Sequence, residues 1–123
     1  MHFDDRLGTV LRIRADGEGM RRIQLRQLLD LLGTLPADAR GEQVDAAFVR
    51  LGELAQVIAP AHCAEILGEP GLRLRSPRLV ATLAAGAPEV ARGALEAAQL
   101  SDEQWLDLLP ALSPATRGHL RDR

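Results

Sequence analysis

His62 and Cys63 are adjacent in the chain, and their side chains are of the types that hold metal ions or act as nucleophiles. Neighbouring positions on a helix project about 100° apart, so the two side chains do not converge on one ion. There is no second cysteine, and the other histidines, His2 and His119, lie near the two ends of the sequence. The further ligands that zinc requires are therefore missing. We expect no metal site, and we expect Cys63 to be a small buried apolar side chain.

The three serines are the other candidate nucleophiles, but each lies where a helix is expected to begin: Ser76, Ser101 and Ser113. A serine in that position accepts a hydrogen bond from the helix backbone, so capping explains its presence. The acidic pairs 4–5 and 102–103 fall in expected first turns, where the helix dipole favours carboxylates. We therefore expect no catalytic residue, no bound cofactor and no enzymatic activity of this chain alone.

Five arginines gather around the first expected bend of the chain: Arg12, Arg14, Arg21, Arg22 and Arg26. One hypothesis is a surface that contacts the acidic face of another domain or protein. The other is a solvated surface whose arginines pair locally with Asp16, Glu18 and Asp30. Nucleic-acid binding is not expected, because the net charge is −2 and aromatic residues make up 2% of the chain.

The composition predicts an all-α fold. Leucine supplies 22 of the 123 residues and alanine 19, whereas the β-branched and aromatic residues that strands prefer are scarce. We expect a single helical domain over 1–123, with an N-terminal part at 1–68 and helix pairs at 76–123. No signal peptide is evident, and no apolar run approaches the roughly 20 residues of a membrane span. A cytoplasmic location without membrane insertion is therefore expected.

Apolar periodicity and start signals predict seven to eight short helices, at 3–14, 20–32, 42–59, 60–68, 77–86, 88–98, 102–112 and from 114 onward. In the second helix, Ile23 is expected to widen the inward stripe. Residues 72–75 alternate like a strand, but they are too short and isolated to pair, so we expect an extended connector. Trp105 is expected in the core or at the edge of the helix stack, with an interface anchor as the alternative.

Short connections favour antiparallel neighbouring helices, and the Ser-Pro starts at Ser76 and Ser113 are 37 residues apart. That spacing is close to the roughly 40-residue period of HEAT repeats. The stretch PRLVATLAAGAPEVAR from Pro77, followed by LSDEQWL from Leu100, resembles a HEAT-like family of bacterial proteins of unknown function. The opening MHFDDRL and the stretch RIQLRQLLDLLG from Arg22 resemble the N-terminal helical region of bacterial sensor histidine kinases.

These resemblances imply a non-catalytic N-terminal regulatory or protein-interaction domain of a two-component histidine kinase. The sequence has no phospho-acceptor helix, Asn box or ATP lid, so a kinase core is expected beyond Arg123. The implied partners are other domains of the same chain or a signalling protein, and a homodimer is one option. The alternative is a free-standing HEAT-like helical-repeat adaptor. A small hydrolase or transferase would need a polar pocket with convergent titratable side chains.

Overall fold

The computed structural model describes residues 2–36 and 38–112. Over these residues the chain is all-α, with seven α-helices, one 3-10 turn and no named strand. This confirms the predicted fold class. The elements are α1 (His2–Leu11), α2 (Glu18–Gly33), α3 (Glu42–Val57), α4 (Pro60–Leu67), α5 (Pro77–Ala84), α6 (Pro88–Ala97), α7 (Asp102–Leu108) and η1 (Leu109–Ala111). The eighth predicted helix, which would begin at Ser113-Pro114, lies outside the described residues.

Two of the three predicted capping serines, Ser76 and Ser101, form caps, and Ser113 lies outside the described residues. The Ser76 hydroxyl accepts a hydrogen bond from the backbone N–H of Leu79 at 3.3 Å, and Pro77 occupies the first turn of α5. In α7 the Ser101 hydroxyl accepts from the Gln104 N–H at 3.1 Å, while the Gln104 side chain accepts from the Ser101 N–H at 2.9 Å. These bonds satisfy backbone donors that a helix start leaves unpaired.

Several helix ends differ from the prediction by two or three residues. α1 ends at Leu11 rather than at 14, and α3 ends at Val57 rather than at 59. The α3 end has a clear cause, because Pro60 disfavours a helical conformation at the residue before it. Ala59 accordingly has ψ 139°, and Ile58 is also extended with ψ 132°.

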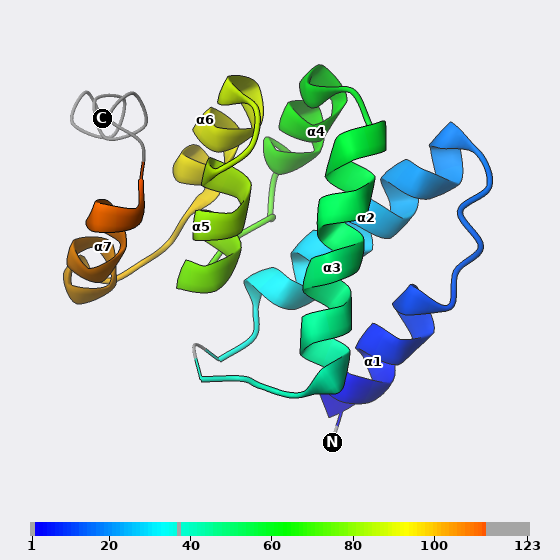
Figure 1. The fold of residues 1–123 in the computed structure, drawn as a ribbon, viewed down its shortest axis with the longest axis horizontal. Coiled ribbons are helices and arrows are strands. Elements are labelled where there is room, and N and C mark those ends of the chain that lie inside the picture. The colour runs from blue at the N-terminus through cyan, green and yellow to red at the C-terminus, as the bar shows by residue number, and fades with distance from the viewer. Residues whose placement is uncertain (1, 37, 113–123) are drawn as a thin grey trace.

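The helices follow one another across the molecule, from α1 at one end to α7 at the other, and α3 crosses in front of α2 (Figure 1). α1 packs against α2 and α3, and α6 packs against both α4 and α5. Buried side chains from α1 through to Leu112 form one continuous cluster. Leucines dominate its centre, and those with no exposed surface include Leu7, Leu28, Leu32, Leu54, Leu74, Leu79 and Leu95.

The expectation that residues 72–75 do not pair is wrong. Leu74 forms an isolated parallel β-bridge with Ala98, the residue that follows α6. Its N–H donates to the Ala97 carbonyl at 3.1 Å, and its carbonyl accepts from the Gln99 N–H at 2.8 Å. The alternation was informative, since Leu72 and Leu74 are buried. Leu74 pairs with the residue that follows α6 and not with another strand. A search for two alternating segments in the sequence therefore does not find this pairing.

The same segment is also bonded to the N-terminal half of the molecule. The backbone N–H of Arg75 donates to the carbonyl of Gly33, the last residue of α2, at 2.8 Å. We call residues 72–75 the connector. It lies between the end of α2 and the end of α6 and is hydrogen-bonded to both.

Candidate interaction surface

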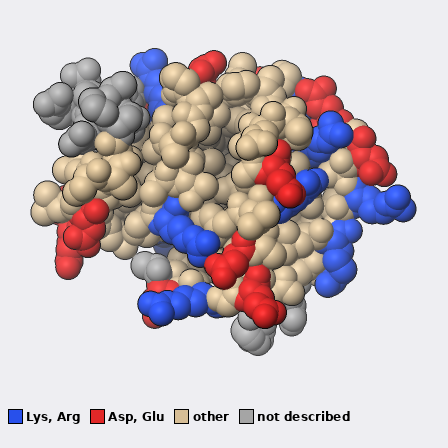
Figure 2. All heavy atoms as spheres, in the orientation of Figure 1, with Lys and Arg blue, Asp and Glu red and all other residues tan. Residues whose placement is uncertain are grey.

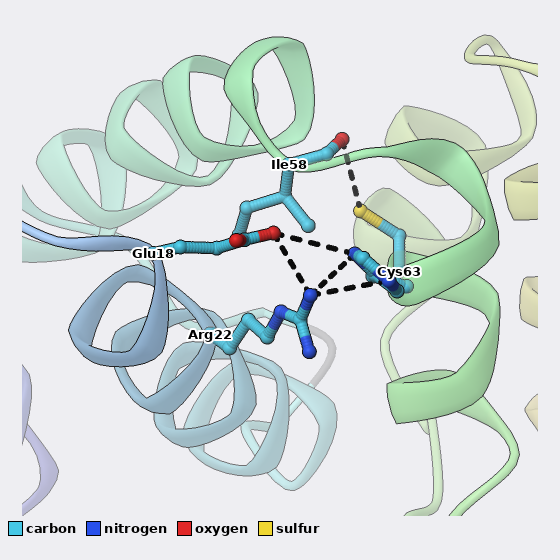
Figure 3. Close-up of polar contacts among 5 residues, drawn as sticks. Glu18, Arg22, Ile58 and Cys63 are labelled. Atoms are coloured by element: carbon cyan, nitrogen blue, oxygen red, sulfur yellow. Dashed lines mark hydrogen bonds and ion pairs between the residues drawn. The ribbon is translucent and has the colours of Figure 1, made fainter.

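Two of the five clustered arginines hold helices together. Arg22 on α2 places Nη2 2.8 Å from Oε1 of Glu18 and 2.6 Å from Nδ1 of His62, which lies on α4 (Figure 3). The Glu18 carboxylate is 3.5 Å from the same histidine nitrogen. Arg22 therefore joins the N-terminal part of α2 to the first turn of α4.

The charges of this cluster shift the pKa of Glu18. The hydrogen bond from Arg22, and then the charge of Arg22, hold the pKa of the Glu18 carboxyl below its usual range, with smaller contributions from His62 and Arg21. Desolvation acts in the opposite direction and is outweighed. Glu18 is thus a carboxylate at neutral pH.

Arg26 makes a similar link one turn further along α2. Its Nε donates to Oε1 of Glu69 at 3.1 Å, and its Nη1 lies 3.9 Å from Oδ1 of Asp30. Glu69 follows α4, so this contact again spans α2 and α4. Sequence reasoning proposed the partners Asp16, Glu18 and Asp30 for this cluster. It missed His62 and Glu69, because both lie about forty residues away from the arginines they contact.

The other three arginines remain at the end of the molecule where α1 and α2 meet. Arg14 reaches Asp16 at 4.0 Å, but both side chains are more than four-fifths exposed. A pair of that kind contributes little to stability. Arg12 and Arg21 form no ion pair within the described part of the chain. Figure 2 shows arginines at this end of the molecule with acidic side chains between them.

Two large apolar side chains are exposed at the start of α2, on either side of Arg21 in the sequence. Met20 is 42% exposed and Ile23 is 47% exposed, both in the first two turns of α2. The expectation that Ile23 widens the inward stripe is therefore wrong. Ile23 lies about 200° around the helix from the buried Leu25, so it faces away from the core. We name Arg12, Arg14, Met20, Arg21 and Ile23 the α1–α2 surface.

A groove between α1 and α2 adjoins this surface. It has a volume of about 410 Å³ and is lined by Arg6, Thr9, Val10, Arg26, Gln27, Asp30 and Leu31. A second hollow of about 480 Å³ lies between α4 and α6. Its lining includes the buried Leu67 and Leu72 together with Glu69, Glu89 and Glu96, of which Glu96 lies 3.8 Å from Arg92.

His62 and Cys63 point to different partners. Cys63 is 3% exposed, and its thiol lies 3.8 Å from the carbonyl oxygen of Ile58 (Figure 3). Burial raises the pKa of this thiol, as expected of an inert small apolar side chain. Across residues 2–36 and 38–112, no three His, Cys, Asp or Glu side chains are grouped so that they could hold a metal ion.

The remaining candidate residues take structural positions or lie outside the described part. Trp105 is half-buried and packs against the core cluster, in keeping with a place at its edge. The described part of the structure does not include Ser113, His119 or the side chain of His2. None of the helices within it is both long enough and apolar enough to cross a lipid bilayer.

Comparisons with protein-family models, with curated proteins and with solved structures find no match to this chain.

Proposed function

We propose that this chain is a non-catalytic regulatory domain that acts by protein–protein contact, made by the α1–α2 surface. The observation that carries the proposal is the half-exposed pair Met20 and Ile23 at the start of α2. Arg21 lies between them in the sequence, and within the described part of the chain it forms no ion pair. Methionine and arginine are enriched in protein interfaces. Fully burying a Met or Ile side chain contributes about 1.5–3 kcal/mol, and roughly half of that remains to be gained here on contact.

The resemblance of the opening residues and of RIQLRQLLDLLG to sensor histidine kinases extends this proposal. On that basis the domain is the N-terminal module of a bacterial two-component histidine kinase in the cytoplasm. Its partner is another domain of the same protein or a separate signalling protein.

The mechanism that we propose is mechanical, with α2 as the moving part. α2 carries Met20 and Ile23 near its start and Gly33 at its end, 16 residues in all. A helix of that length is a rod of about 24 Å. The Gly33 carbonyl is bonded to Arg75, and Leu74 of the same connector is bonded to Ala97 and Gln99. A contact that shifts α2 therefore moves the connector against the chain that leads into α7.

The test begins with the encoded polypeptide beyond Arg123. If a kinase core follows, Ile23→Asp in the full-length protein should change its autophosphorylation rate or the response of that rate to a signal. Val49→Asp is the matched control, because Val49 is 64% exposed on the outer side of α3. Unchanged kinase activity and regulation in Ile23→Asp, and on deletion of residues 2–112, would contradict a regulatory role.

A free-standing HEAT-like adaptor is the second candidate. It is favoured by the close packing of α6 on α4, where a Cβ added to Gly93 would lie 3.2 Å from Leu67. Helical-repeat proteins are built from helices that stack on their neighbours along the chain. A polypeptide whose continuation contains further helix pairs and no kinase core would favour this candidate over the first.

A further inference from the structure

We infer that the outer side of α2 binds an acidic amphipathic helix of a partner protein, and this inference rests on the proposed function. The binding residues form a line along α2, which we name the α2 outer stripe: Met20, Ile23, Gln27 and Leu31. It runs from the exposed apolar pair into the groove between α1 and α2.

The spacing of the stripe fits a helix laid along it. The four residues are separated by three, four and four positions, so they lie on one side of α2. From the first to the last they extend over about 16 Å, which is close to three turns of a partner helix. An amphipathic helix that lies in such a groove places apolar side chains at intervals of three and four residues.

The stripe ends, at Gln27 and Leu31, in a groove that is deep enough to receive side chains of a partner. Its walls come from Thr9 and Val10 on α1 and from Gln27 and Leu31 on α2. Val10 and Leu31 are 7% and 6% exposed, so an apolar floor lies beneath the polar rim. Side chains of a partner can therefore be held on two sides there, whereas Met20 and Ile23 offer a flatter contact.

Charge around the stripe selects an acidic partner. Arg6 and Arg26 line the groove, and Arg21 lies between Met20 and Ile23 in the sequence. Asp30 is the acidic residue among the described residues that line the groove, and it lies 3.9 Å from Arg26. Arg26 is already bonded to Glu69, whereas Arg6 and Arg21 form no ion pair within the described part of the chain. The guanidinium groups of Arg6 and Arg21 therefore complement carboxylates on the flanks of a partner helix and oppose a basic one.

An anionic membrane surface would share the preference for arginine beside apolar side chains. The concave groove favours a narrow ligand over a flat bilayer. We therefore assign the stripe to a protein helix, and membrane binding becomes an outcome of the test.

The experiment is a selection from a displayed library of 14-residue helical peptides with randomised composition, using the whole chain as bait. Peptides that rise to dominance should carry excess Asp and Glu and have apolar residues three and four positions apart. Against such a peptide, Ile23→Asp should weaken binding at least tenfold and Arg21→Glu several-fold. Val49→Asp should leave the affinity within twofold, and circular dichroism checks that each variant is folded.

Several results would overturn the inference. Basic or uncharged peptides could dominate, the selected peptides could bind Ile23→Asp as well as the parent, or no peptide could be enriched. Binding of the parent chain to vesicles of phosphatidylserine and phosphatidylcholine, lost in Ile23→Asp, would assign the stripe to membranes instead. Peptides of another composition that bind another face would refute the acidic helix while leaving the proposed interaction function standing.

Discussion

Gly33 and Arg73 lie so close together that a Cβ atom added to Gly33 would be 2.5 Å from the carbonyl oxygen of Arg73. Only glycine lets the last turn of α2 approach the connector to this distance. The approach also brings the Gly33 carbonyl within 2.8 Å of the Arg75 N–H. The contact between the two halves of the molecule therefore requires a glycine, which has no side chain, at position 33.

Gly33→Ala should destabilise the fold by about 1–3 kcal/mol, because the backbone of the connector must move to admit the methyl group. Equilibrium unfolding in urea measures this change. Gly52→Ala is the matched control: Gly52 lies inside α3, and a Cβ there meets nothing within 4 Å. That control should instead gain about 0.5–1 kcal/mol from helix propensity. Equal effects of the two substitutions would contradict the close approach.

Gln24 is a buried polar side chain with no exposed surface, and it links three segments. Its Nε2 donates to the Val10 carbonyl at 2.9 Å, and its Oε1 accepts from Nε of Arg50 at 2.9 Å. Gln24→Leu should cost about 1–3 kcal/mol for each partner left unsatisfied in the interior. Urea unfolding measures the loss, and Gln56→Leu at an exposed position on α3 should change stability by less than about 0.5 kcal/mol. Unchanged stability in Gln24→Leu would contradict a net stabilising role for these two bonds.

The pKa of Glu18 should depend on Arg22. Arg22→Gln removes the hydrogen bond and the charge that lower this pKa, so the value should rise toward the ordinary range of a glutamate. NMR titration of the side-chain carboxyl measures it. Arg50→Gln is the control, since Arg50 contacts Gln24 and Glu53 instead.

The same shift gives the stability a pH dependence. The Glu18 pKa is lower in the folded chain than in the unfolded chain, so the ion pair stabilises the fold above the ordinary pKa of glutamate. This contribution is lost as the pH falls through the lowered pKa. Stability measured across that range should therefore decline less in Glu18→Gln than in the parent, and an identical decline would contradict the pairing.

Cys63 should be inert toward thiol reagents while the chain is folded. Its side chain is 3% exposed, and burial raises its pKa, so little thiolate is present to react. A chromogenic disulfide reagent at pH 8 should label it slowly in native buffer and rapidly in urea. Rapid labelling of the folded chain would indicate an accessible, reactive thiol and would contradict the prediction that Cys63 is inert.

Local sequence signals predicted much of this fold, because they act within one helix. The serine and proline starts at Ser76, Pro77 and Ser101 place α5 and α7, since a cap needs only residues three positions away. The inward stripes of α4 and α6 were likewise predictable, as shown by the burial of Cys63 and Leu95.

Features that depend on tertiary contact were not predictable in this way. The pairing of Leu74 with Ala98 joins positions 24 residues apart. The bond between Arg22 and His62 spans 40 residues, and no local pattern marks it. The prediction that Ile23 faces the core was wrong, although helix geometry alone sets Ile23 opposite the buried Leu25. Plotting the angular positions of the α2 residues would have placed Ile23 on the exposed side with Met20.

The central claim is that the chain works by contact through the outer side of α2. Amide hydrogen exchange of the whole chain, with and without a peptide from the selection above, tests it most directly. The account predicts that added protection falls on residues 6–14 and 18–31, with a smaller change at the amides of Leu74 and Arg75. Protection confined to α5–α7, or none at a saturating peptide concentration, would contradict it.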